Sequence, residues 1–123
     1  RGKAALDTKS DEMKFRFSFQ TIDANFHIDR RPEVATLDAD KLSFPLLVRP
    51  IGKGDRFVPF GMQGTKLVGD FLTDNKVSPF ARRRQLVVEN ADKNIVWLVG
   101  CRIDNRYGID PNRSQKALVI SLE

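Results

Sequence analysis

Strict alternation between apolar and polar side chains at positions 13–20 constrains the fold more than any other feature of the chain. The apolar members are Met13, Phe15, Phe17 and Phe19. A period of two is typical of a β-strand with one buried and one solvated face. After Thr21 the apolar positions shift by one residue, which would exchange the two faces. We therefore expect a bulge or a strand break near Thr21.

Other apolar runs predict further strands. They lie at 34–37, 44–49, 86–88, 95–99 and 117–122. A turn-rich segment, 89–94, separates the third run from the fourth, so these two form a predicted hairpin. The segment between the second and third runs is different, because Leu67, Val68, Phe71 and Leu72 have helical spacing.

We expect Thr65 to cap this short helix, Pro79 to end it, and residues 80–84 to add one further turn. The predicted class is α+β, with mostly antiparallel sheet and one short helix. Residues 1–12 are polar and predict a flexible lead-in, followed by a single domain at 13–123.

The chain contains no apolar run long enough to span a membrane, and its first residues lack the apolar core of a secretory signal. Cys101 is the single cysteine, which excludes an intramolecular disulfide and is typical of a reducing compartment. We therefore expect a cytoplasmic protein.

Positive charge is concentrated in one segment. The net charge is +5, and residues 49–84 hold eight lysines and arginines against three aspartates, so the remainder of the chain sums to zero. A neutral protein with one basic segment suits a polyanion, because phosphate contacts release condensed counterions. A well-solvated surface segment and an acidic protein partner are the alternatives that charge alone leaves open.

Side chains suited to catalysis are scarce. His27 falls on the polar phase of its segment and is expected to be exposed, whereas Cys101 follows a buried strand and is expected to act as a small core residue. Asp38 and Asp40 flank what we interpret as an exposed turn. The sequence has no metal-ligand spacing, so neither a catalytic site nor a metal site is predicted.

Two segments could contact phosphate. The glycine-rich stretch 61–66 precedes the predicted helix, where backbone N–H groups favour an anion, although a purely structural cap fits equally well. Three arginines at 82–84 would fan over about 200° if helical, so some of them could instead pair with Asp70 or Asp74. The nearby phenylalanines, at 57, 60, 71 and 80, are interpreted as core, which favours folded or duplex RNA over an unpaired strand.

The central sequence resembles a known family. Gly54-Asp55-Arg56-Phe57-Val58-Pro59-Phe60-Gly61-Met62 and the following Gly64 to Val77, together with Ile95-Val96-Trp97-Leu98-Val99-Gly100-Cys101-Arg102-Ile103-Asp104, closely resemble the C-terminal domain of the tRNA(Ile)-lysidine synthetases. The resemblance covers roughly residues 34–107. It also implies a fold shared with a module of the phenylalanyl-tRNA synthetase β subunit.

The resemblance implies a parent enzyme that uses ATP and Mg²⁺ to attach lysine to the wobble cytidine of a minor isoleucine tRNA with a CAU anticodon. Catalysis would reside in an N-terminal PP-loop domain whose signature this chain lacks. We therefore expect no enzyme activity and no cofactor in this chain. Its expected partners are the tRNA body and that N-terminal domain, with a homodimer left open.

The leading hypothesis is a tRNA-binding domain, and the alternative is a structural interdomain or dimerisation module that docks an acidic surface. The predicted RNA-binding residues are Arg49, Lys53, Arg56, Thr65, Lys66, Lys76, Arg82, Arg83, Arg84, Arg102 and Arg106.

Overall fold

The computed structural model describes residues 6–8 and 14–123. The elements, in chain order, are β1 (Leu6–Thr8), β2 (Phe15–Thr21), β3 (Val34–Asp38), the 3-10 turn η1 (Ala39–Lys41), β4 (Leu46–Pro50), β5 (Arg56–Phe57), β6 (Lys66–Leu67), α1 (Val68–Asp74), α2 (Pro79–Arg83), β7 (Leu86–Glu89), β8 (Ile95–Leu98), β9 (Arg102–Ile103), the 3-10 turn η2 (Asn105–Tyr107) and β10 (Lys116–Leu122).

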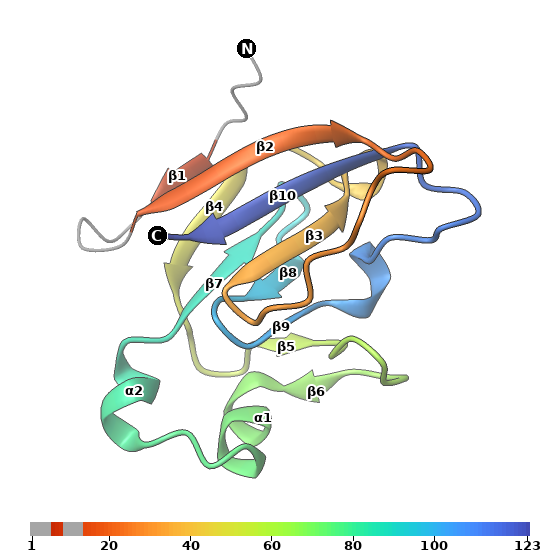
Figure 1. Ribbon diagram of the computed structural model, residues 1–123. Coiled ribbons are helices and arrows are strands. Elements are labelled where there is room, and N and C mark those ends of the chain that lie inside the picture. The colour runs from red at the N-terminus through yellow and green to blue at the C-terminus, as the bar shows by residue number, and fades with distance from the viewer. Residues whose placement is uncertain (1–5, 9–13) are drawn as a thin grey trace.

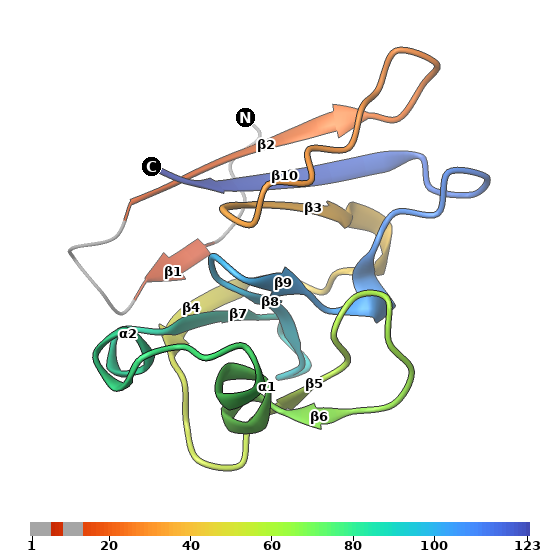
Figure 2. The same ribbon diagram turned by 60° about the horizontal axis from the view of Figure 1, so that its bottom comes forward.

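Two larger sheets form the body of the molecule (Figures 1 and 2). One has five strands in the order β1-β4-β7-β8-β9, and the other has three in the order β2-β10-β3. Strands β5 and β6 pair separately as a small ribbon next to α1. Among the described pairings only β1 with β4 is parallel. The predicted α+β class with mostly antiparallel sheet is confirmed.

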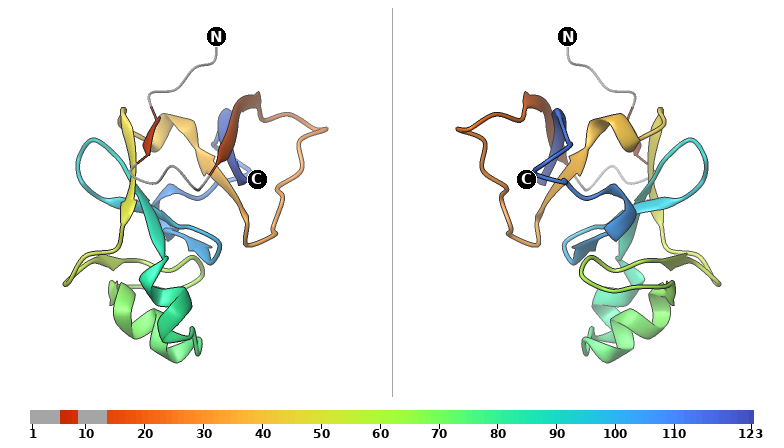
Figure 3. Two further views of the ribbon diagram at one scale, coloured as in Figure 1. Left: turned by 90° about the vertical axis from the view of Figure 1, so that its left-hand side faces the viewer. Right: turned by 90° about the vertical axis from the view of Figure 1, so that its right-hand side faces the viewer.

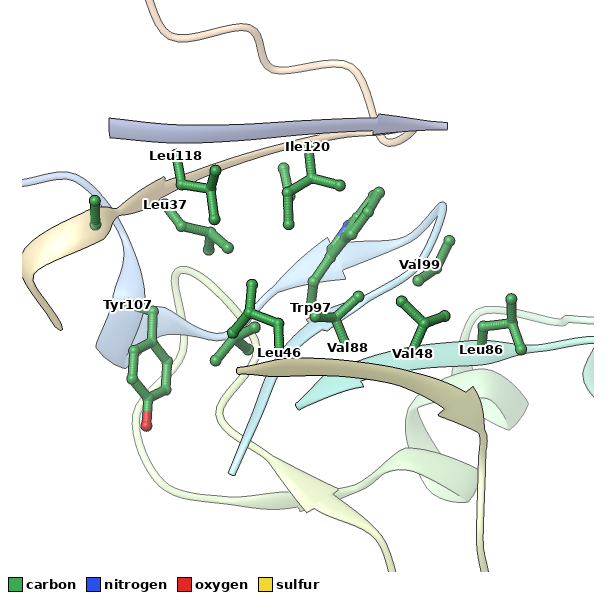
Figure 4. Close-up of a cluster of buried hydrophobic side chains, with 13 residues drawn as sticks. Leu37, Leu46, Val48, Leu86, Val88, Trp97, Val99, Tyr107, Leu118 and Ile120 are labelled. Atoms are coloured by element: carbon green, nitrogen blue, oxygen red, sulfur yellow. The ribbon is translucent and has the colours of Figure 1, made fainter. Parts of the chain in front are cut away.

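The main core lies between the two larger sheets. Figure 4 shows Leu118 and Ile120 pointing from β10 towards Leu46 and Val88 on the other sheet, with Trp97 between the two layers. Each of these five side chains is at most 1% exposed. The phenylalanines of β2 pack against the edge of this core and are only half-buried, as an edge strand with one solvated face should be. The amphipathic strand predicted at 13–20 is thus confirmed from Phe15 onward, since Met13 lies outside the described residues.

A second core forms on the opposite face of the five-stranded sheet. Val87 and Leu98 point there, and α1 covers them with Phe71 and Leu72. The central strands β7 and β8 are therefore buried on both faces, which explains their continuous apolar runs. The same layer attaches the β5–β6 ribbon, because the Phe57 ring packs edge-to-face on Phe71 with the ring centroids 5.3 Å apart.

Several boundaries follow the prediction. The hairpin is confirmed as β7–β8, the last strand as β10, and the break near Thr21 as the end of β2, with no further strand before Val34. Pro79 does follow the first helix, but as the first residue of a second helix, α2, for which the Ser78 hydroxyl accepts a hydrogen bond from the Ala81 amide.

Two predictions need correction. The expected flexible lead-in contains the strand β1 at 6–8, because the edge of β4 offers it parallel pairing partners; the rest of that prediction lies outside the described residues. Asp38 is not in an exposed turn but 4% exposed, and its carboxylate accepts hydrogen bonds from the Ser114 hydroxyl and the Asp40 amide. It therefore anchors η1 to the loop before β10.

Candidate nucleic-acid interface

Arg49 lies at the centre of an ion-pair network that fastens β4 to its neighbours. Its guanidinium donates to both carboxylate oxygens of Asp55, at 2.9 and 3.0 Å, and to Glu89 at 2.8 Å. All three side chains are largely shielded from water, with side-chain exposures of 23%, 17% and 13%. One positive and two negative charges meet here, so Arg49 adds no positive potential to the surface.

The network also shifts the ionisation of its members. Burial by itself would raise the pKa of Asp55, but hydrogen bonds from Arg49 and from the Gly52 amide outweigh it and leave that pKa below its ordinary value. The pKa of Arg49 rises, chiefly through its hydrogen bonds to Asp55. Both shifts favour the charged pair, so the network is a structural clamp at the start of the basic segment.

Two other predicted cations also have acidic partners. Arg106 forms a two-pronged pair with Asp104, at 3.0 and 2.9 Å, and the fully buried Asp104 carboxylate accepts the Val58 amide at 2.8 Å. The pKa of Arg106 is raised, first by its hydrogen bonds to Asp104. Lys66 pairs with Asp74 across the start and end of α1. These cations neutralise protein carboxylates.

The expected helix cap at Thr65 is wrong. The helix begins at Val68 with Leu67 as its N-cap residue and no side-chain cap, because Lys66 and Leu67 pair with β5 as a strand. The Thr65 hydroxyl instead accepts a hydrogen bond from Arg56 at 3.1 Å. Strand β6 therefore begins at the end of the glycine-rich stretch 61–66, and the argument for a phosphate contact at a helix N-terminus does not apply to this stretch.

Arg82 fastens α2 to α1. Its guanidinium donates to the Gly69 carbonyl at 3.2 Å and to the Thr73 hydroxyl at 2.6 Å, rather than to Asp70 or Asp74. Figure 3 shows the two helices together at the end of the molecule opposite β2. None of the five residues of α2 is buried. The helix therefore contributes nothing to either core.

The remaining predicted cations are exposed and surround α1. This set, hereafter the cationic surface, comprises Lys53, Arg56, Lys76, Arg83, Arg84 and Arg102. Each comes from a segment that contacts α1: the turn and strand around β5 through Asp55, the chain after the helix through Thr73, α2 through Arg82, and β9 through Arg102, whose guanidinium lies 5.2 Å from the Phe71 ring centroid. Within the described part of the chain, Lys53 and Lys76 have no ionic partner.

Two aromatic residues were assigned wrongly. Phe57 and Phe71 are core residues as predicted, but Phe60 is 41% exposed and Phe80 is 67% exposed. Phe80 stands on α2 with the Arg84 guanidinium 5.7 Å from its ring centroid. Its position between a proline and three arginines is the only sequence signal for this exposure, since a helix of five residues is too short to show periodicity.

His27 and Cys101 lie outside the cationic surface. His27 is exposed as predicted. Cys101 is half-buried, burial raises the pKa of its thiol, and its Sγ lies 3.7 Å from the Gln85 side-chain oxygen. Among the described residues no group of His, Cys, Asp or Glu could hold a metal ion. No helix in the described ranges is long and apolar enough to cross a membrane.

Comparison with known proteins gives consistent similarities. The family described as the TilS substrate C-terminal domain matches residues 46–120. A tRNA(Ile)-lysidine synthase of Parabacteroides distasonis is 41% identical over 108 residues, which cover 88% of this chain and 24% of that protein. The tRNA(Ile)-lysidine synthase of Bacteroides thetaiotaomicron is 45% identical over 86 residues, or 70% of this chain and 20% of that protein. The chain thus spans a quarter or less of these relatives.

Two solved structures share the fold. A crystal structure of a TilS C-terminal domain superposes with a TM-score of 0.73 at 23% identity, covering 89% of this chain and 82% of that one. An N-terminal fragment of the phenylalanyl-tRNA synthetase β subunit from Pyrococcus horikoshii also gives a TM-score of 0.73, at 11% identity, over 97% of this chain and 42% of that one.

Proposed function

This chain belongs to the family described as the TilS substrate C-terminal domain, found in tRNA(Ile)-lysidine synthase, and we propose that it binds the tRNA body through its cationic surface. The observation that carries the proposal is α2, a helix that buries no side chain yet is fastened in place by the Ser78 cap and by Arg82. A segment held rigidly without serving the core is suited to presenting side chains to a partner. What it presents is Phe80 with Arg83 and Arg84.

Phosphate contact explains the chemistry of this surface. The residues of the cationic surface belong to several different segments that contact α1, so their side chains can reach separate backbone phosphates. Such contacts fix the register of a folded RNA without reading its sequence. The proposed contact set excludes Arg49, Lys66 and Arg106, because each of them forms an ion pair with a protein carboxylate. Two further predicted residues have a supporting role in the proposal: Arg82 fastens α2 to α1, and the Thr65 hydroxyl accepts a hydrogen bond from Arg56.

In the parent enzyme this binding would position the tRNA for chemistry elsewhere. We propose that an N-terminal domain, using ATP and Mg²⁺, attaches lysine to the wobble cytidine of an isoleucine tRNA with a CAU anticodon, and that the enzyme works in the cytoplasm. The contribution of the present domain would be orientation, since a misplacement of reacting groups by about 1 Å can cost on the order of 100-fold in rate.

The test is the salt dependence of tRNA affinity. Binding of this chain to an isoleucine tRNA transcript should weaken linearly in log Kd against log salt. Lys76→Gln combined with Arg83→Gln should reduce the magnitude of that slope by about two. Arg113→Gln is the control, because Arg113 is exposed in the loop before β10. Figure 1 shows that this loop lies away from both helices.

An elongator methionine tRNA compared in the same assay reports discrimination between tRNAs. A folded chain that binds neither tRNA at low salt refutes the proposal and favours the structural alternative, in which the same cations dock an acidic surface of a neighbouring domain. Equal losses of affinity for the double variant and for Arg113→Gln would also refute it, because they would show a diffuse charge effect instead of a defined surface.

A further inference from the structure

A pocket of about 490 Å³ opens beside the cationic surface, and the proposed function does not use it. One wall is the segment 28–32 before β3, and the other is formed by the turn into β9 together with residues from the 109–111 loop. Its size falls within the range of sites that bind small organic groups, about 300–1,000 Å³. No sequence pattern indicated it, because its walls come from segments up to some eighty residues apart.

The lining combines an apolar interior with a cationic surround. Trp97, Val34 and Ile103 line it, and the half-exposed ring of Phe60 stands at one side. That ring is held over Gly108, where a β-carbon would lie only 3.1 Å from its Cε1 atom. Three arginines and one carboxylate also line the pocket: Arg30, Arg31, Arg102 and Asp29. All three arginines are exposed, and Arg31 pairs with Asp29 at 2.7 Å, so the charges of Arg30 and Arg102 remain in excess.

Arg102 connects the pocket to the cationic surface. Its guanidinium lies over Phe71 of α1 and at the same time lines the pocket. A phosphate chain that follows the cationic surface would therefore pass the pocket mouth. Charge complementarity accordingly favours an occupant that is planar, apolar on its faces and joined to a phosphate.

Thr36 has a buried hydroxyl in the lining of the pocket. It is 4% exposed, it lines the pocket, and among the described residues its hydroxyl is the one buried side-chain oxygen or nitrogen without a hydrogen-bond partner. Alternation along β3 explains its direction, since Ala35 and Leu37 point into the main core while Val34 and Thr36 point towards the pocket. A rotation of χ1 by one staggered step exchanges the threonine hydroxyl and methyl.

An unsatisfied buried hydroxyl is costly, and such groups normally have a partner when a site is complete. We propose that the pocket takes up one unpaired nucleotide of the bound RNA, with the base against Phe60 and the apolar wall, an edge atom hydrogen-bonded to Thr36, and the phosphate beside Arg30 and Arg102. Aromatic and apolar walls with a few polar contacts are how proteins hold a base that has left its stack. The proposal rests on the proposed RNA-binding function and adds a defined subsite to it.

Nucleoside monophosphates test the subsite directly. Each of AMP, CMP, GMP and UMP is titrated into the isotopically labelled chain while NMR follows the Thr36 methyl and the Trp97 indole. We expect saturable shifts confined to the pocket for at least one nucleotide. Thr36→Val keeps the shape and removes the hydroxyl, so affinity should fall roughly 3- to 10-fold while the thermal midpoint stays the same or rises. Thr21→Val, on the exposed end of β2, is the matched control and should change neither.

A second variant and a second ligand keep the test decisive. Arg30→Gln changes only an exposed side chain and should weaken the nucleotide phosphate contact about threefold, which carries the test if Thr36→Val does not fold. A blunt-ended RNA duplex has no unpaired nucleotide and should bind Thr36→Val and the parent chain equally. If the duplex binds with a steep salt dependence but mononucleotides give no pocket shifts, the subsite is overturned while the proposed function stands. Pocket shifts without any binding of duplex RNA or tRNA would overturn the proposed function and the RNA origin of the occupant together.

Discussion

Arg49 is a structural ion-pair residue, whereas Arg83 belongs to the proposed RNA-binding surface. Arg49→Gln should destabilise the domain without a direct effect on RNA affinity. Arg83→Gln should weaken RNA binding and leave the stability of the domain almost unchanged. Arg49→Gln removes the hydrogen bonds to Asp55 and Glu89, whose carboxylates remain shielded from water. The shorter glutamine amide cannot reach both carboxylates. Arg83 is exposed, and among the described residues its side chain donates one hydrogen bond, a long contact of 3.4 Å to the Pro79 carbonyl.

The expected size follows from the burial of the network. Breaking a fully buried ion pair costs about 3–5 kcal/mol, and an exposed pair contributes at most about 1 kcal/mol. With Arg49 at 23% side-chain exposure and its partners more buried, we expect a loss of about 2 kcal/mol in the free energy of unfolding. For a domain of this size that corresponds to a fall in Tm of roughly 8 °C. Arg83→Gln should change the free energy of unfolding by less than about 0.5 kcal/mol.

The pH dependence of the loss identifies its cause. Because the folded-state pKa of Asp55 is depressed, the network stabilises the fold fully above the ordinary carboxylate pKa of about 4 and ceases to do so as pH falls through the folded-state pKa. The difference in the free energy of unfolding between the parent chain and Arg49→Gln should therefore be largest near pH 7 and decrease as the pH falls below about 4. Arg49→Lys should fall between the two, because an ammonium keeps the charge but not the two-pronged geometry.

Urea unfolding followed by Trp97 fluorescence measures the stabilities, and tRNA binding is measured at a temperature where every variant is folded. The structural role of Arg49 would be refuted if Arg49→Gln lowered the free energy of unfolding by less than about 0.5 kcal/mol. It would also be refuted if the difference from the parent chain did not depend on pH. Weakened tRNA binding by folded Arg49→Gln with unchanged stability would show instead that Arg49 belongs to the interface.

Four further outcomes follow. Ser78→Ala should lower the free energy of unfolding by about 1 kcal/mol in urea titrations, because the first turn of α2 loses its cap; no loss would show that α2 is not coupled to global stability. Lys76→Gly should raise stability by about 0.5–1 kcal/mol while weakening tRNA binding, since Lys76 has a φ of 59°; lower stability would contradict the strain. Phe80→Ser should leave Tm unchanged and weaken tRNA binding, and a large fall in Tm would show that the ring serves packing. Cys101 should react with a disulfide reagent at pH 8 more slowly than a free cysteine, because burial raises its pKa; equal rates would show that the thiol is open to solvent.

The family resemblance was carried by the central sequence, and the family match at 46–120 confirms it. That stretch is specific because close packing and turn geometry fix its residues individually. Phe57 is fully buried, Asp55 accepts the Gly52 amide, and Asp104 is fully buried where it accepts the Val58 amide. The motif therefore reflects the packing and the turns of the domain.

Local patterns determined the strands and their ends. Alternation in β2, the two apolar runs of β7 and β8, and the turn between them depend on neighbouring residues, so they are visible in one dimension. The short strand β1 was not visible, because its existence depends on the distant edge of β4. The cap assigned to Thr65 failed for the same reason, since pairing of Lys66 with β5 delays the helix.

The total charge of the basic segment was fixed by sequence, but its distribution was decided by tertiary contacts. Arg49 and Arg83 are indistinguishable by composition. The turn after β4 brings Asp55 back to Arg49, and pairing of β4 with β7 brings Glu89 to it, so that Arg49 is neutralised whereas Arg83 is exposed. The pocket around Thr36 is likewise a product of assembly. Periodicity and residue type specify what a segment can form with itself, whereas ion pairs and cavities require partners that the chain brings together only when it folds.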